Sequence, residues 1–306
     1  MRHTKTRLEG RWVLITGAGH GLGRALAGAF ADAGSRIIVT DHDPDRVVST
    51  TRWLSRRGNA AVGIEMDVTS EQSVAEARRD VISRIGSIDV LVNNAGIVRG
   101  GPFTDVPLEE HLRTLDVNTH GPIRVTHAFL PDLLASPTAH LVNIISASAL
   151  IGLPGASTYA ASKWALLGFS ESLREELRRA GHAHACVTAV CPSYISTGLF
   201  AGVRPPRFTR MLTPAAVARQ VVKAVLNRRR KLMLPRSVSL ISLSRALLPE
   251  SWSQRLGDWT GIHAGMADWH GHQHSPTDPL TAAAATPMAA SSDSSDSSET
   301  APLPGS

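Results

Sequence analysis

The fold of this chain is decided by residues 12–23, which read WVLITGAGHGLG. The apolar run that ends at Thr16 predicts a short strand, and apolar residues at helical spacing from Leu22 to Phe30 predict a helix after it. Glycines at 17, 19, 21 and 23 let the backbone turn tightly, and a helix N-terminus offers N–H groups to an anion. Strand, glycine loop and helix together predict a binding site for the pyrophosphate of a dinucleotide.

Strands and helices alternate along the chain to about residue 250. Apolar runs predict further strands at 36–40, 61–66, 88–92, 141–145, 185–190 and 231–234. Periodic segments between them predict helices at 44–57, 71–85, 108–134, 158–179 and 213–227. Nearly continuous apolar strands separated by helices indicate a parallel sheet covered on both faces. We therefore predict an α/β fold with a single doubly wound parallel sheet of the Rossmann type.

The chain falls into three predicted parts. They are a nucleotide-binding domain at residues 1–250, a C-terminal cap segment at 251–274 and a tail at 275–306. The tail is rich in Ser and Ala, contains four acidic residues and no Lys or Arg, and is expected to be disordered because it cannot form an apolar core. Without the tail, 32 basic residues stand against 22 acidic ones, so the body carries +10 where the whole chain carries +6.

Composition excludes several classes of protein. Apolar residues make up 42% of the 306, which allows a large core, and two cysteines cannot supply a disulfide framework or a cysteine-rich zinc site. No apolar stretch is long enough for a membrane-spanning helix, and residues 1–11 lack the apolar core of a secretory signal. We therefore expect a cytoplasmic protein without a metal site, in which the histidines of residues 270–274 are a solvated polar segment.

Asp41 follows the second predicted strand, 18 residues beyond Gly23. A carboxylate at this place accepts hydrogen bonds from a ribose diol and repels a 2′-phosphate, which favours NAD over NADP. Two observations keep NADP open: the segment around Asp41 also reads as a turn, and His20, Arg24 and Arg46 offer positive charge.

Tyr159 and Lys163 lie four residues apart in the first turns of a predicted helix, so their side chains share one face. A free phenol has a pKa near ~10, and a neighbouring ammonium lowers that value. Tyr159 is then expected to exchange a proton with a substrate oxygen while a hydride moves at the adjoining carbon. The alternative is a surface pair without a function. The upstream glycine loop argues against it.

Two serines and an asparagine upstream of this pair are further candidates for the site. Ser146 and Ser148 follow the fifth predicted strand, where ligands of a parallel sheet bind, and either can bond a substrate oxygen or simply cap the strand end. Pro122 has no N–H, so the carbonyl of Asn118 loses its helical donor and the long helix is expected to kink there.

The glycine spacing TGxxxGxG at residues 16–23, Asn93-Asn94-Ala95-Gly96 and the YxxxK pair resemble the short-chain dehydrogenase/reductase family over about residues 8–250. The resemblance implies that Ser146, rather than Ser148, is the catalytic serine. It further implies that Asn118 anchors a water linking Lys163 to solvent. It also implies that Asp67 and Val68 flank an adenine and that Thr197 contacts a nicotinamide amide. The predicted cofactor-binding residues are then Gly17, Gly19, His20, Gly21, Leu22, Gly23, Asp41, Asp67, Val68, Asn94, Ala95, Gly96, Tyr159, Lys163, Pro192 and Thr197.

The predicted reaction is hydride transfer between NAD and a lipophilic secondary alcohol or ketone, steroid-, retinoid- or fatty-like. Tyr159 is the general acid/base, and Ser146, Lys163 and Asn118 complete the catalytic group. The segment from Gly198 to Leu212 carries apolar residues suited to a lid, and the predicted substrate contacts are Ser148, Leu153, Leu199 and Phe200. The alternatives are an NADPH-dependent carbonyl or 3-oxoacyl reductase and a non-catalytic dinucleotide-binding sensor.

The partners follow from the same features. The family resemblance implies a homodimer or homotetramer packed through the Asn118 and Tyr159 helices. The basic run from Arg228 to Lys231 is read as a solvated helix end in preference to a peripheral membrane contact. No recognition helix or base-stacking platform is evident, so no nucleic-acid partner is expected.

Overall fold

The computed structural model describes residues 7–207, 209–239, 247, 249–262 and 264–271. The predicted tail at 275–306 lies outside these residues, as do the last three residues of the predicted cap. The three-part division of the chain stays a prediction.

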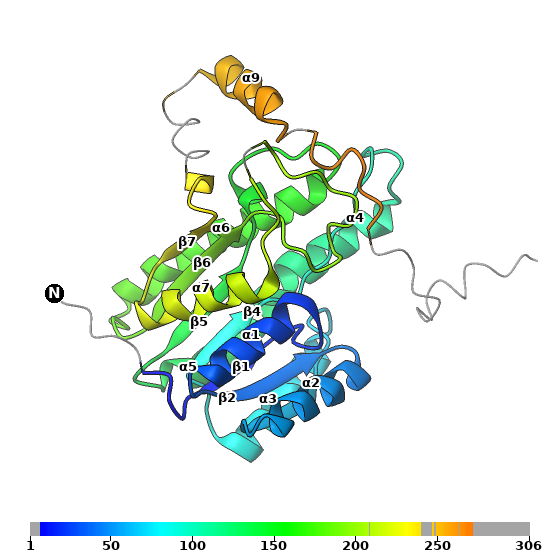
Figure 1. The fold of residues 1–306 in the computed structure, drawn as a ribbon. Helices are drawn as coiled ribbons and strands as arrows, with labels where there is room; N and C mark the ends of the chain where they lie inside the picture. The colour runs from blue at the N-terminus through cyan, green and yellow to red at the C-terminus, as the bar shows by residue number, and fades with distance from the viewer. Residues whose placement is uncertain (1–6, 208, 240–246, 248, 263, 272–306) are drawn as a thin grey trace, which may run out of the picture. The chain divides into compact units, whose positions relative to one another are not determined.

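The described part of the chain contains one seven-stranded sheet in which every neighbouring pair of strands is parallel. The strand order β3-β2-β1-β4-β5-β6-β7 reverses direction between β1 and β4, so the chain winds outward twice from the middle of the sheet (Figure 1). The predicted doubly wound parallel sheet is confirmed. The strands are β1 Trp12–Ile15, β2 Arg36–Asp41, β3 Ala61–Glu65, β4 Val90–Asn93, β5 His140–Ile144, β6 Cys186–Pro192 and β7 Lys231–Leu234.

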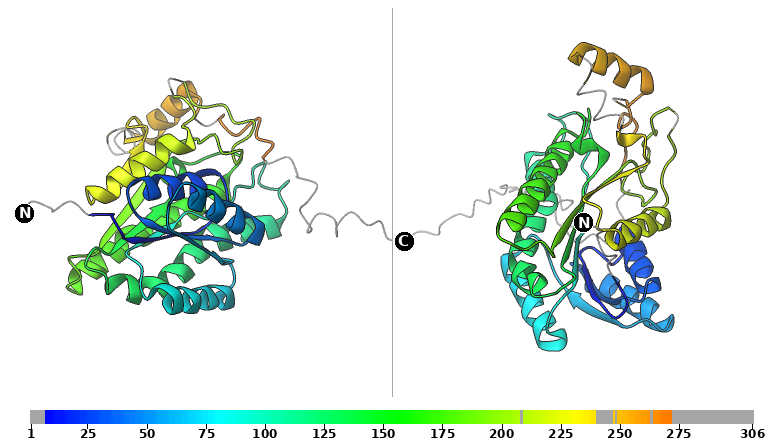
Figure 2. Two further views of the ribbon diagram at one scale, coloured as in Figure 1. Left: turned by 60° about the horizontal axis from the view of Figure 1, so that its bottom comes forward. Right: turned by 90° about the vertical axis from the view of Figure 1, so that its left-hand side faces the viewer.

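Helices cover both faces of the sheet (Figure 2). One layer holds α1 Gly21–Asp32, α2 Pro44–Arg56 and α7 Pro214–Leu226. The other holds α3 Glu71–Ile85, α5 Gly121–Leu134 and α6 Ser157–Arg179, with α4 Leu108–Leu115 packed against α6. A further helix, α9 Glu250–Thr260, precedes the last described segment.

Two apolar layers form the core, because successive strand residues point to opposite faces. Val13 and Ile15 of β1 pack towards Phe30 of α1, and Leu14 between them packs towards Phe129 of α5. All five are buried, and the neighbouring strands alternate in the same way. This two-sided burial holds the C-terminal ends of β1, β4, β5 and β6 at one edge of the sheet.

The helix predicted over 108–134 is interrupted by a π-helical turn, Asp116–His120, between α4 and α5. The Gly121 N–H donates to the Asp116 carbonyl, five residues back, and Pro122 has no N–H to give to Asn118. The interruption was expected at this place, but the sequence indicated only a kink. The wider turn leaves Asn118 fully buried beneath the edge of the sheet where the strands end.

Two further observations bear on the sequence predictions. Cys186 and Cys191 are both buried, free cysteines of β6. Among the helices formed by described residues, none is long and apolar enough to cross a membrane.

Candidate active site

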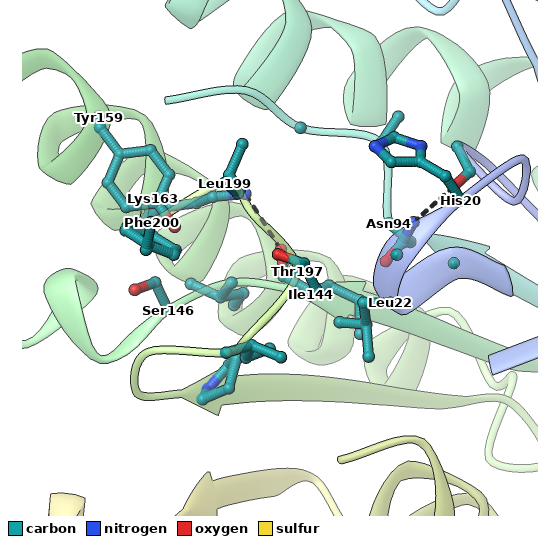
Figure 3. A pocket seen from close by; sticks show the side chains of 18 of the residues that line it. His20, Leu22, Asn94, Ile144, Ser146, Tyr159, Lys163, Thr197, Leu199 and Phe200 are labelled. Carbon is teal, nitrogen blue, oxygen red and sulfur yellow. Dashed lines mark hydrogen bonds between the residues drawn. The ribbon is translucent and has the colours of Figure 1, made fainter. Parts of the chain in front are cut away.

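A cleft opens where the C-terminal ends of the central strands meet the glycine loop (Figure 3). Its empty volume, including the open mouth, is about 770 Å³. Most of the predicted site residues line it. They are Gly17, His20, Gly21, Leu22, Gly23, Asn94, Ala95, Gly96, Ser146, Tyr159, Lys163, Pro192, Thr197, Leu199 and Phe200.

The glycine loop is packed so closely that side chains would not fit at three of its positions, Gly17, Gly19 and Gly23. A Cβ on Gly23 would lie 2.0 Å from the Gly17 carbonyl oxygen. Gly17 has a φ of +62°, and a Cβ there would lie 2.9 Å from the Cα of Ala95. The His20 side chain does not cap α1. The loop therefore leaves a backbone-lined cradle at the helix N-terminus, which fits the pyrophosphate of a dinucleotide.

Thr16 and Asn94 tie this loop to the end of β4. The Asn94 side-chain amide donates to the carbonyls of Thr16 and Gly17 at 2.9 and 3.2 Å. The Thr16 hydroxyl in turn accepts the N–H groups of Asn94 and Ala95, each at 3.0 Å. Sequence reasoning assigned no role to Thr16, although its place at the C-terminal end of the first strand was a usable signal.

Asp41 lies behind the cradle and does not line the cleft. Its side chain is 2% exposed, and its carboxylate accepts the Gly19 N–H at 3.0 Å and the Asp43 N–H at 3.2 Å. His42 lies 3.1 Å from the same carboxylate. Burial alone would raise the pKa of Asp41, but the His42 side chain and the two N–H groups together lower it below its ordinary value. Asp41 therefore carries its negative charge at neutral pH, next to the loop that holds the predicted phosphates.

Tyr159 and Lys163 lie together on α6, as their spacing predicts (Figure 3). Both are buried, and the ammonium lies 5.7 Å from the centroid of the phenol ring. The Lys163 Nζ donates to the Ile144 carbonyl at 3.2 Å, which places it at the end of β5.

The acidity of this pair differs from the sequence prediction. Burial raises the pKa of Tyr159 to about 12, and the Ser146 side chain lowers it by less. Burial also lowers the pKa of Lys163 to about 8. The net shift is opposite to the one expected from the sequence, because removal from water raises the pKa of the Tyr159 phenol. The phenol is therefore protonated at neutral pH, while the ammonium can release a proton slightly above it.

Ser146 lies two residues beyond the end of β5, and its side chain is within hydrogen-bonding reach of Tyr159. Its hydroxyl accepts the Ser148 N–H at 3.1 Å and lines the cleft. Ser148 is buried and does not line the cleft, and its hydroxyl has no hydrogen-bond partner among the described residues. The geometry thus brings Ser146, and not Ser148, to the Tyr159 phenol.

Asn118 supports the site from the π-helical turn. Its side chain accepts the Ile97 N–H and donates to the Ile97 carbonyl, each at 2.9 Å, and also donates to Ser162 at 3.1 Å. A Cβ on Gly96 would lie 3.1 Å from the Asn118 Oδ1 and 3.5 Å from the Lys163 Nζ. The side chain thus fixes the loop after β4 beside the ammonium. Sequence reasoning did not assign this role to it.

The remaining predicted residues lie around these groups. Thr197 faces Gly21 across the cleft. Asp67 lies two residues beyond the end of β3 and does not line the cleft, and its carboxylate accepts hydrogen bonds from the N–H and the hydroxyl of Thr69. Val68 packs against Gly121, and Leu153 is buried in an apolar cluster with Tyr159. The cleft also takes in residues that the sequence did not single out, namely Ile144, Ile145 and Ile195. All three lie at or just beyond the ends of β5 and β6, a position that could have indicated them.

No group of three or more His, Cys, Asp and Glu side chains within the described ranges is arranged to hold a metal ion. The site instead combines a backbone cradle that fits a dinucleotide with a buried phenol, an ammonium and a hydroxyl at the ends of neighbouring strands. This combination defines a dinucleotide-dependent oxidoreductase.

Comparisons with known proteins agree with this class. A sequence profile of the family described as short chain dehydrogenase matches residues 11–207. The chain is 34% identical to epidermal retinol dehydrogenase 2 of Mus musculus over 261 residues, which cover 84% of each chain. It is 28% identical to estradiol 17-beta-dehydrogenase 11 of Mus musculus over 254 residues, which cover 82% of this chain and 84% of the relative.

A solved structure has the same fold. It is a short chain dehydrogenase/reductase from Burkholderia phymatum in complex with NAD, with a TM-score of 0.71 and 25% identity. The match covers 79% of this chain and 95% of that one. The chain belongs to the short-chain dehydrogenase/reductase family. It is an NAD(P)-dependent oxidoreductase of the alcohol dehydrogenase and ketone reductase type.

Proposed function

We propose that this protein transfers a hydride between NAD and a lipophilic secondary alcohol or ketone of the retinoid, steroid or fatty type. The observation that carries the proposal is the surroundings of Tyr159. Its phenol is buried in a cluster with Leu153, Phe200 and Met266, so a substrate oxygen that reaches it brings its carbon skeleton into an apolar space. The names of the relatives, a retinol and an estradiol dehydrogenase, support a lipophilic alcohol as the substrate.

Each reacting side chain has a separate task. When bound, the nicotinamide ring supplies hydride acceptance and donation. Ser146 holds the substrate oxygen next to Tyr159 and fixes its orientation. For ketone reduction the protonated phenol donates its proton to that oxygen, and for alcohol oxidation it must first lose it. Lys163, with its pKa lowered by burial to about 8, is placed to receive or replace that proton.

Asp41 supports NAD as the preferred cofactor. The Gly19 N–H holds the carboxylate in place, so this buried negative charge would repel a 2′-phosphate near the loop. His42 and Arg46 lie close to this carboxylate and supply the positive charge on which NADP binding would depend.

A panel of alcohols tests the substrate class. The wild-type protein is mixed with NAD or NADP and either lipophilic alcohols (a retinoid, a hydroxysteroid and a long-chain secondary alkanol) or small polar alcohols, and formation of the reduced cofactor is followed. We expect higher kcat/KM for the lipophilic set. Preferred turnover of the polar alcohols would overturn the substrate class, and NADP-only turnover would overturn the cofactor assignment.

We also propose that two copies of the chain associate through the helices that carry the site. Leu108 and Leu112 of α4, Ile123 of α5 and Trp164 of α6 expose apolar side chains on this layer. Light scattering tests this: the wild type should be at least a dimer, and Leu112→Glu with Trp164→Glu should give monomers. A monomeric wild type would refute it.

A cytoplasmic location is proposed on the sequence grounds above, and cell fractionation tests it.

A further inference from the structure

Two segments that are far apart in the sequence pack against each other beside the cleft, which is lined by Leu199 and Phe200 of the first. One is the lid loop, residues 198–207, and the other is the strap, residues 264–271. Hydrogen bonds of 3.2 Å join the Arg204 N–H to the Gly265 carbonyl, the His270 N–H to the Ala201 carbonyl and the Trp269 indole to the Leu199 carbonyl. An exposed ion pair of 2.7 Å links Arg204 to Asp268. The lid loop is therefore attached to the strap along its length.

The strap is packed equally closely on its other side, against the loops that follow β4 and β5. A Cβ on Gly100 would lie 2.7 Å from the Trp269 ring and 2.9 Å from the Met266 Cε. A Cβ on Gly155, which follows β5, would lie 3.3 Å from the Met266 Cβ. These glycines leave the room in which Met266 and Trp269 fit between the lid loop and the ends of the strands.

Met266 belongs to the apolar cluster that surrounds the phenol. It is 4% exposed and shares this cluster with Tyr159, Phe200 and Leu153. The Phe200 ring meets the Tyr159 ring edge to face, with 5.8 Å between their centroids (Figure 3). A substrate whose oxygen reaches Tyr159 therefore lies against Phe200, and Met266 of the strap packs in the same cluster as both rings.

We propose that Met266 and Trp269 of the strap determine which alcohols the enzyme accepts, by filling the apolar space beside Tyr159 and Phe200, which line the cleft. The inference rests on the proposed function and names the residues that limit its substrate. Met266 does not line the cleft itself, but it packs in the cluster that contains the lining residues Tyr159 and Phe200. Trp269 holds Met266 in place through its hydrogen bond to the lid loop and its contact with Gly100. Admission of a substrate then requires the lid loop and the strap to move together.

The test is a chain-length profile of kcat/KM with NAD and a homologous series of secondary alkanols. Met266→Ala removes most of the side chain, and one missing methylene in an apolar pocket is worth about 10-fold or more in discrimination. We expect the ratio of kcat/KM for the longest to the shortest alcohol to rise by at least about 10-fold. Met266→Leu, which keeps the volume, should retain the wild-type profile.

Trp252→Ala is the matched control. Trp252 lies on α9, in the same C-terminal region, but is 60% exposed and is not part of the cluster. It should leave the profile unchanged. NADH binding, followed by fluorescence, verifies that each variant keeps its nucleotide site.

The possible failures are distinguishable. A wild type that oxidises none of the alkanols, retinoids or steroids would overturn the proposed function itself. A wild type that oxidises them, together with a Met266→Ala variant that binds NADH and keeps the wild-type profile, would overturn only the role of the strap. An equal shift in Trp252→Ala would also overturn it, because the effect would then not come from the cluster around Tyr159.

Discussion

Acid should destabilise this protein through His140, a fully buried histidine at the start of β5. Its Nε2 lies 2.7 Å from the Thr188 hydroxyl, which itself donates to the Arg229 carbonyl. Because the hydroxyl proton is already used, Nε2 must carry the proton of a neutral ring. Nδ1 is buried without a hydrogen-bond partner among the described residues.

Protonation of this ring would bury an unpaired charge. Burial lowers the pKa of His140 from 6.5 to about 3, and the charge of Arg228 acts in the same direction. In the unfolded chain the histidine takes up a proton below pH 6.5, while the folded protein resists it down to about pH 3. The free energy of unfolding is therefore unaffected by His140 above pH 6.5. It falls by up to about 1.4 kcal/mol per pH unit below that pH, until the folded protein also takes up the proton near pH 3.

Urea unfolding of the wild type and of His140→Leu at pH 7.5 and pH 4.5 measures this effect. Between those pH values the wild type should lose about 3 kcal/mol more than the variant, because the variant has no group to protonate at this place. Other acid-sensitive groups are common to both proteins and cancel in the difference. Equal losses in the two proteins would refute the reasoning.

Two further predictions concern the glycine loop. Gly23→Ala should weaken NADH binding by about 10-fold or more, because its methyl would lie 2.0 Å from the Gly17 carbonyl oxygen. The control is Gly168→Ala on α6, whose methyl meets nothing within 4 Å. This variant should raise the Tm slightly. Equal NADH affinities in fluorescence titrations would contradict the close packing. Asp41→Asn removes the buried charge and should improve NADP binding relative to NAD by about 10-fold. An unchanged ratio of the two affinities would show that Asp41 does not select the cofactor.

The fold was largely predictable, because its signals are local. The apolar strand at Trp12, the glycine loop and the alternation that follows repeat a pattern that only a covered parallel sheet satisfies. Strand boundaries were less predictable. β4 starts at Val90 rather than at 88, and the Asp89 carboxylate just before it accepts hydrogen bonds from the Trp12 N–H, Arg11 and Ser136.

The site was predictable in its members but not in its electrostatics. The i, i+4 spacing places Tyr159 and Lys163 on one face, but the distance from the ammonium to the phenol and the burial of both depend on β5. The wider π-helical turn likewise depends on how Asn118 reaches Ile97. The strap lies in the predicted cap segment, but its contacts were beyond sequence reasoning. They join residues near 100, 155 and 200 to residues near 266.

The central claim is that Tyr159 exchanges the proton in the reaction. Its most direct test compares Tyr159→Phe with Tyr194→Phe, the same change at the chain's second tyrosine, whose hydroxyl packs against Gly265. With a lipophilic alcohol that the wild type oxidises, Tyr159→Phe should lower kcat by about 100-fold or more while NADH affinity stays within a few-fold. Tyr194→Phe should retain most of the wild-type kcat. Wild-type turnover by Tyr159→Phe would contradict the account.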